Sequence, residues 1–261
     1  MSKPLDALAA IGRAVFGACR LTGRIALFGL DGLSHLARPP LYGRAILRAF
    51  LDIGYYSLPV VALTAIFTGM VLALQSATGL SRFNAESAVA NLVVLSITRE
   101  LGPVLAGLMV AGRVGAAMAA ELGTMRVTDQ IDALSTLSTN PMKYLVAPRL
   151  LGGLLALPLL VLVADILGVL GGFIIASVKL GYNAQVYLTN TLNFVQTGDV
   201  VSGLVKAAVF GFLVTLMGCY HGYNSRGGAQ GVGTATTNAV VSASVLILAF
   251  DYVLTELFFA R

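Results

Sequence analysis

Charged side chains are scarce in this sequence. Asp, Glu, Lys and Arg make up 11% of its 261 residues, whereas apolar residues make up 57%. An average soluble domain carries roughly 25% charged residues, because water must wet its surface. A chain this poor in charge is expected to expose much of its surface to lipid. Its long apolar runs agree with this expectation, since about 20 helical residues cross a bilayer core.

Motifs for catalysis, metal binding and nucleotide binding are also missing. Cys19 and Cys219 form no CxxC pair and only two histidines are present, so neither a disulfide framework nor a zinc site is expected. No Gly-Lys dipeptide occurs, which excludes a Walker A loop for nucleotide phosphates. HExxH and GxSxG are absent as well. We therefore expect no enzymatic activity and no cofactor, and energy for any transport would come from an ion gradient or a separate ATPase.

The first 50 residues are predicted to form an amphipathic region. Arg13, Arg20, Arg24 and Asp31 are spaced so that they fall on one narrow stripe of a helix, opposite mostly apolar side chains. This pattern is typical of a helix lying in the membrane interface, with its arginines among the head groups. A short soluble helix packed on another surface is the alternative. Arg38-Pro39-Pro40 is predicted to break the helix.

The remainder, residues 51–261, is predicted to be an all-α membrane domain with five spans. The second apolar segment is too long for one straight crossing. It either projects beyond the bilayer as one long helix or bends at Gly102-Pro103, because proline removes an interior hydrogen bond. Two short helices are a less favoured alternative. The expected spans are about 54–78, 88–120, 150–177, 200–220 and 238–259.

The distribution of basic residues predicts the orientation of these spans. Of the 17 Lys and Arg residues, twelve fall in segments on the side of the N-terminus, three on the opposite side and two within spans. Cytoplasmic segments carry the excess of Lys and Arg, so the N-terminus is expected to be cytoplasmic. The net charge of +5 is explained by this topology and does not call for a nucleic-acid partner.

Five charged residues fall inside the predicted spans: Arg99, Glu100, Asp165, Lys206 and Asp251. Each costs roughly 2.5–3.5 kcal/mol at mid-bilayer unless it faces a cavity or pairs with another charge. Two are positive and three negative, so near-complete internal pairing is possible. The pairs could serve only to join helices, or they could form a polar cavity or coupling network. Lys206 and Asp251 lie near span ends and could instead reach the interface.

The segment 121–137, between the second and third spans, is predicted to contain a short amphipathic helix. Thr128 is a candidate N-cap, and Asp129 would lie near the positive end of the helix dipole. Ile131, Leu134 and Leu137 share one face. An exposed apolar face calls for a partner, which in a transporter would be a soluble subunit. The alternative is a helix resting on the membrane surface.

Five separated stretches resemble the MlaE/YrbE family, the permease subunits of ABC systems that pair with an MCE-domain lipid-binding protein. Together they span almost the whole chain and are specific in combination. The stretches are Thr68-Gly-Met-Val-Leu-Ala-Leu-Gln75, Arg99-Glu-Leu-Gly-Pro-Val104, Ala111-Gly-Arg113, the segment from Glu121 to Gln130, and Asp251-Tyr-Val-Leu254.

The resemblance implies a homodimeric permease in the bacterial inner membrane, with a cytoplasmic ATPase, a periplasmic MCE-domain protein and a small STAS-domain subunit as partners. Its substrate would be phospholipid, exchanged between inner and outer membranes through a cavity at the dimer interface. The family's buried charges correspond to Arg99, Glu100, Lys206 and Asp251, whereas Asp165 is added from its position in a span. Segment 121–137 would be the coupling helix that docks on the ATPase, with candidate residues Glu121, Gly123, Met125, Thr128, Asp129, Gln130, Ile131 and Leu134.

Two other function classes compete with this interpretation. A gradient-driven secondary transporter could use buried Asp and Glu as proton carriers. The odd number of spans, without an inverted repeat, argues against it. A membrane-embedded lipid-modifying enzyme would need a carboxylate or metal cluster that the sequence does not show.

Overall fold

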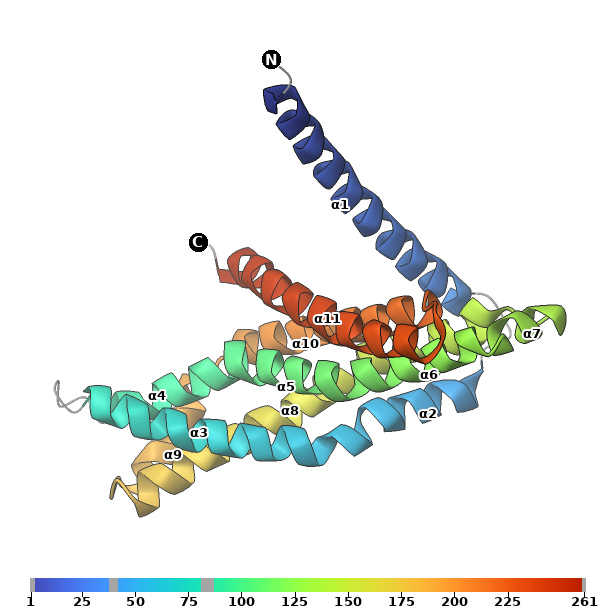
Figure 1. The fold of residues 1–261 in the computed structure, drawn as a ribbon. Helices are drawn as coiled ribbons and strands as arrows, with labels where there is room; N and C mark the ends of the chain where they lie inside the picture. The colour runs from blue at the N-terminus through green and yellow to red at the C-terminus, as the bar shows by residue number, and fades with distance from the viewer. Residues whose placement is uncertain (1–2, 38–41, 81–86, 260–261) are drawn as a thin grey trace.

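The computed structural model describes residues 3–37, 42–80 and 87–259, in which every regular element is a helix (Figure 1). The prediction of an all-α chain is confirmed for these residues. The elements η4, η5 and η6 are π-helical turns. In chain order the elements are α1 (Lys3–Ser34), η1 (His35–Ala37), α2 (Gly43–Ile53), η2 (Tyr55–Ser57), α3 (Leu58–Leu80), α4 (Ser87–Ser96), η4 (Ile97–Leu101), α5 (Gly102–Val110), η5 (Ala111–Gly115), α6 (Ala116–Val127), α7 (Gln130–Thr136), η6 (Met142–Val146), α8 (Ala147–Val178), α9 (Ala184–Phe194), α10 (Thr197–Tyr223) and α11 (Gly228–Phe259).

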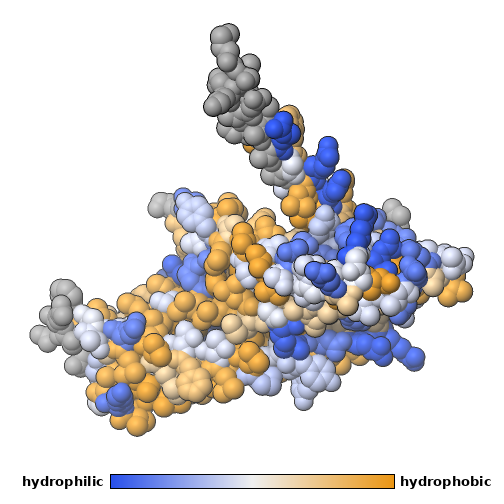
Figure 2. Space-filling view, in the orientation of Figure 1, coloured by the Kyte–Doolittle hydropathy of each residue, from blue (hydrophilic) through white to orange (hydrophobic). Residues whose placement is uncertain are grey.

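Five helical segments are long and apolar enough to cross a membrane, as predicted. Each is longer than the apolar core that the sequence shows, because the helices continue through polar residues at their ends. Figure 2 shows apolar side chains along much of the bundle and hydrophilic ones gathered at the end that carries α7. The five segments are Gly43–Leu80, Ala88–Val127, Met142–Val178, Thr197–Tyr223 and Gly228–Phe259.

The N-terminal helix α1 stands away from the bundle (Figure 1). Among its described side chains, contacts with the rest of the chain lie near the C-terminal end, where the Phe28 ring lies edge-on to Tyr220 at 5.6 Å and Gly32 faces Leu150. Apolar and basic side chains farther along α1 are both exposed, including Phe16 at 77%. The helix ends at Ser34, and the predicted break at Arg38-Pro39-Pro40 lies outside the described residues.

Glycines allow the central helices to approach closely. A Cβ atom on Gly69 of α3 would overlap the Gly168 carbonyl of α8, and one on Gly171 would overlap the Ile66 carbonyl. Small residues of this kind let helix backbones touch in lipid, where van der Waals packing replaces the hydrophobic effect. The α3–α8 pair is therefore the tightest contact on that side of the bundle.

The second span is one helix, continuous from α4 to α6. Directly before Gly102-Pro103, where a bend is one of the expectations, the backbone forms the π-helical turn η4. The Gly102 amide donates to the Ile97 carbonyl five residues back, and Pro103 lies in the first turn of α5. Proline lacks the amide that an α-helix would use there, so the wider turn keeps the helix unbroken.

The helix α9 (Ala184–Phe194) lies between the third and fourth spans and is not among the predicted elements. Asn183 caps it by accepting hydrogen bonds from the amides of Gln185 and Val186 at 3.0 and 3.2 Å. Tyr187 anchors α9 against α4 and α8 and is 4% exposed. Burial raises the pKa of its phenol to about 12.

Candidate functional site

Lys206 is the centre of a charged cluster inside the bundle. It lies in the middle of α10 and is fully buried. Its Nζ lies 2.8 Å from Glu100 Oε2 of η4 and 2.9 Å from Asp251 Oδ1 of α11. One ammonium thus joins three helices that are distant in sequence. The possibility that Lys206 reaches the interface is excluded by its burial.

Two further oxygens complete the surroundings of this ammonium. Lys206 Nζ donates to Thr255 Oγ1 at 2.6 Å and to the Arg99 carbonyl at 3.1 Å. Thr255 in turn contacts Glu100 Oε1 at 3.2 Å and donates to the Asp251 carbonyl at 2.7 Å. An ammonium has three protons to donate, and here four oxygens surround it. We refer to Lys206, Glu100, Asp251 and Thr255 as the Lys206 cluster.

Arg99 makes a separate pair next to this cluster. Its guanidinium contacts Asp199 Oδ1, with Nη2 at 2.6 Å and Nε at 2.7 Å, and the Asp199 side chain is only 5% exposed. The Phe259 ring covers the same guanidinium at 4.1 Å from the ring centroid. Asp199 also belongs to the capping box at the start of α10, where its Oδ2 accepts from the Gln196 amide. The charge network therefore fixes the N-terminus of α10 as well as its middle.

Asp165 does not join either pair. It is 7% exposed on α8, and its Oδ1 has no hydrogen-bond partner among the described residues. Its carboxyl lies against Gly102, directly after η4. The near-complete pairing within this set that the charge count allows is thus not what the structure shows. Three form the Lys206 cluster, Arg99 pairs with a residue outside the expected set, and Asp165 is left alone.

Asp199 and Thr255 were missed, although the sequence carries a signal for each. Asp199 follows Gln196 by three residues at a helix start, the spacing of a capping box and a place where negative charge favours the helix dipole. Thr255 follows Asp251 by four residues, so the two side chains share one face of α11. The expected fourth span begins at about residue 200, so Asp199 lies just outside it.

The predicted coupling segment is divided between two helices. Glu121, Gly123 and Met125 belong to the last turns of α6, which extends to Val127. The separate helix α7 covers only Gln130–Thr136. Glu121 Oε1 forms an ion pair with Arg149 of α8 at 2.7 Å. The expectation of one helix over 121–137 is therefore wrong. Glu121, Gly123 and Met125 belong to the membrane-spanning segment that ends with α6.

The cap of α7 also differs from the prediction. Asp129 occupies the N-cap position with φ of 57°, and no side chain caps the helix. Thr128, the expected cap, donates instead to the Thr124 carbonyl at 2.8 Å, and Gln130 Nε2 donates to its hydroxyl at 3.0 Å. The left-handed conformation at Asp129 turns the chain sharply between α6 and α7, which fits an Asp since this residue tolerates positive φ.

The apolar face of α7 faces its own bundle. Ile131 is 1% exposed and Leu134 is half-buried, both packed on the chain's main core, whereas Leu137 is 74% exposed. Arg126 and Asp132 form an ion pair at 2.6 Å that ties α7 to α6. The prediction of an apolar face open to a partner is therefore wrong for Ile131 and Leu134. What α7 presents outward is a polar surface that ends in Leu137.

The described residues contain no cluster of three or more His, Cys, Asp or Glu side chains able to hold a metal ion. The carboxylates of the Lys206 cluster are occupied by an ammonium and a hydroxyl. The arrangement holds opposite charges between three helices.

Comparison with known proteins agrees with the geometry. The family model described as Permease MlaE matches residues 46–257. A "Probable ABC transporter permease protein" of Rickettsia bellii is 55% identical over 249 residues, 95% of this chain and 96% of that protein. The "Intermembrane phospholipid transport system permease protein MlaE" of Haemophilus influenzae is 32% identical over 253 residues, 97% of each chain. The Arabidopsis thaliana "Protein TRIGALACTOSYLDIACYLGLYCEROL 1, chloroplastic" is 34% identical over 92% of this chain and 66% of that protein.

The family match, these relatives and the five apolar helices point to the same conclusion. The chain belongs to the MlaE permease family and is a multi-pass membrane permease.

Proposed function

We propose that this chain is the membrane subunit of an ABC transporter that moves phospholipid between the inner and outer membranes of a bacterium. The observation that carries the proposal is the continuous helix Ala88–Val127. One part of it holds Glu100 in the Lys206 cluster, and its far end is tied to α7. A movement imposed on α7 can thus reach the charges that join three spans.

The proposal that the substrate is phospholipid is supported by the names of related proteins. The Haemophilus influenzae relative is named as part of an intermembrane phospholipid transport system, at 32% identity over nearly the whole chain. The more similar Rickettsia bellii relative is named only as an ABC transporter permease. The charged side chains inside the bundle are compatible with a lipid cargo, since a polar head group needs polar groups inside a membrane protein.

A separate cytoplasmic ATPase would supply the energy. The chain has no Walker A loop of its own, so ATP would bind to that subunit. The exposed side chains of α7 and of the residues flanking it, from Thr128 to Leu137, are the surface we assign to the ATPase. Since Ile131 and Leu134 anchor α7 on the bundle, a push on this surface moves α6 together with α7.

The remaining features of the proposed complex follow from the family and from charge. We assign the chain to the bacterial inner membrane with a cytoplasmic N-terminus, where the excess of Lys and Arg would lie. It would act as a homodimer, with α1 lying in the membrane interface. A periplasmic MCE-domain protein would exchange the lipid, and a STAS-domain subunit would accompany the ATPase.

The proposal is tested by purifying the chain with its copurifying subunits and measuring ATP-driven lipid transfer in proteoliposomes. Leu137→Asp should abolish ATPase association or its coupling to transfer, because the substitution places a charge at an exposed apolar side chain that we expect to contact the ATPase. Leu192→Asp on α9 is the matched control, since Leu192 is 76% exposed in another part of the chain. Normal assembly and transfer in Leu137→Asp would reject the assigned surface, and absence of any copurifying ATPase would reject the ABC assignment.

Gradient-driven transport is the second candidate, and the unpaired Asp165 favours it. A buried carboxyl without a partner could carry a proton. Collapsing the proton gradient with an ionophore separates the two candidates, because ATP-driven transfer continues and gradient-driven transfer stops.

A further inference from the structure

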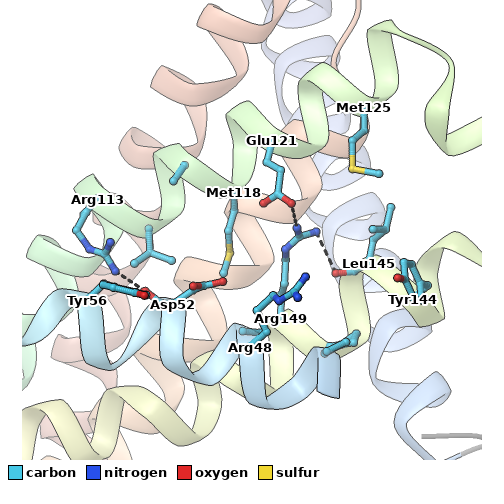
Figure 3. A pocket seen from close by; sticks show the side chains of 15 residues that line it. Arg48, Asp52, Tyr56, Arg113, Met118, Glu121, Met125, Tyr144, Leu145 and Arg149 are labelled. Carbon is cyan, nitrogen blue, oxygen red and sulfur yellow. Dashed lines mark hydrogen bonds and ion pairs between the residues drawn. The ribbon is translucent and has the colours of Figure 1, made fainter. Parts of the chain in front are cut away.

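A cavity of about 500 Å³ lies between α2, α6 and the start of α8 (Figure 3). Pockets for small molecules and cofactors enclose roughly 300–1,000 Å³, so its size suits a head group. Three arginines reach into it from three different elements: Arg48 from α2, Arg113 from η5 and Arg149 from α8. We call it the arginine cavity.

Two of these arginines already have partners. Arg149 pairs with Glu121 and donates to the Leu145 carbonyl at 3.2 Å. Arg113 donates to the Ser57 hydroxyl at 2.7 Å and to the Asp52 carbonyl. These bonds hold both guanidiniums in place on the cavity wall, as the dashed lines in Figure 3 show for Asp52, Glu121 and Leu145.

Arg48 is different, because no carboxylate of the described residues pairs with it. The cavity walls carry three guanidiniums against the carboxylates of Asp52 and Glu121, which leaves an excess of positive charge. A phosphate oxygen is the group that an arginine fork binds best, through two parallel charged hydrogen bonds. Arg48 is exposed at the cavity, so its donors are accessible to an anion that enters.

The rest of the lining favours an amphiphile over a free anion. Met118, Met125 and Leu145 line the same cavity as the arginines. Outside it, α2 exposes Leu47 and Leu51 at 59% and 44%. An occupant with a charged head and an apolar chain satisfies both parts of this surface.

Tyrosines place the cavity near the membrane boundary. Tyr56 and Tyr144 line it, and both are exposed, as is the neighbouring Tyr55. Tyrosine is enriched at membrane–water interfaces, where its ring sits at the level of the head groups. Basic pockets between spanning helices at the cytoplasmic side of membrane proteins hold anionic lipid head groups.

We propose that the arginine cavity binds the phosphate of an anionic phospholipid, with Arg48 as the residue that contacts it. The lipid's acyl chains leave past Leu47 and Leu51 into the bilayer. This site is distinct from the Lys206 cluster and goes beyond the proposed transport, because it requires only a phospholipid and no ATPase.

Binding is measured on the full-length protein, purified with its copurifying subunits, incubated with equal amounts of phosphatidylglycerol and phosphatidylcholine in detergent, and separated from free lipid. No ATP is added, so a negative result here leaves the transport proposal standing, and failure of transport leaves this one standing. Arg48→Gln should lower the retained phosphatidylglycerol about tenfold, the loss of one charged hydrogen-bonding group. Arg44→Gln is the matched control, because Arg44 is exposed on the same helix and does not line the cavity.

Retention of phosphatidylglycerol over phosphatidylcholine, lost in Arg48→Gln and kept in Arg44→Gln, supports the proposal. Equal loss in both variants would show diffuse surface attraction and overturn it. So would equal retention of both lipids, or complete displacement of the lipid by millimolar inorganic phosphate, which would identify a free anion as the ligand. Retention only after removal of an ATPase would assign Arg48 to a protein contact and also overturn the proposal.

Discussion

Replacing Lys206 with methionine should expose what holds α10 in place. The substitution keeps an unbranched side chain of similar size but removes the ammonium between Glu100 and Asp251. Breaking a buried ion pair by removing one partner costs about 3–5 kcal/mol, because the other charge stays unpaired. We expect about 3 kcal/mol, at the low end of that range, since the side chains of Glu100 and Asp251 are 37% and 20% exposed.

This loss is large enough to measure as a melting temperature. For a chain of this size, 1 kcal/mol corresponds to roughly 2–4 °C, so Lys206→Met should melt about 6–12 °C below the parent protein. Cys219 is buried and Cys19 is exposed. In a Cys19→Ser background, a thiol-reactive fluorophore therefore reports unfolding through Cys219 while the protein is heated in detergent.

A triple variant provides the control for charge. Combining Lys206→Met with Glu100→Gln and Asp251→Asn leaves no unpaired carboxylate, so most of the lost stability should return. The reasoning is refuted if Lys206→Met melts within about 2 °C of the parent. It is refuted equally if the triple variant melts as low as the single one, because the loss would then come from packing.

Three further substitutions test other parts of the structure by the same melting assay. Gly69→Ala should lower the midpoint because its Cβ would overlap the Gly168 carbonyl, whereas Gly79→Ala, which meets no atom within 4 Å, should not; equal midpoints would contradict the close α3–α8 contact. Ile131→Asp should cost about 3 kcal/mol or more, since it buries a charge at a position only 1% exposed; a parent-like midpoint would mean that α7 is not anchored. Asp165→Asn should raise the midpoint by a few degrees, about 1 kcal/mol, because it removes an unpaired buried carboxylate, and a lower midpoint would indicate a charged partner.

The five spans could be predicted from the sequence because lipid imposes one rule on every residue it touches. The cost of charge in the bilayer also identified Lys206, Glu100 and Arg99 as residues that must be paired or face a cavity. The partner of Arg99 could not be identified in the same way. Asp199 lies in a polar stretch that reads as a loop, and only the tertiary structure brings it within 2.6 Å of Arg99.

Helical periodicity also has a limit that α7 illustrates. Ile131 and Leu134 were correctly placed on one apolar face, but the same pattern arises whether a partner protein or the chain's own bundle covers that face. Pro103 poses a similar problem. The missing amide predicts that the helical hydrogen bonds change, but not that the change takes the form of a π-helical turn before the proline.

The continuous second span has a mechanical consequence. From Leu101, the last residue of η4, to Val127, the helix runs 26 residues, or about 39 Å at 1.5 Å per residue. If η4 acts as a pivot, a rotation of about 5° there displaces the far end by about 3 Å over that length. The helix therefore acts as a lever with unequal arms. A small rotation beside Glu100 produces a displacement of about 3 Å where the helix meets α7. Stiffness along α5 and α6 then matters as much for transport as any single contact at either end.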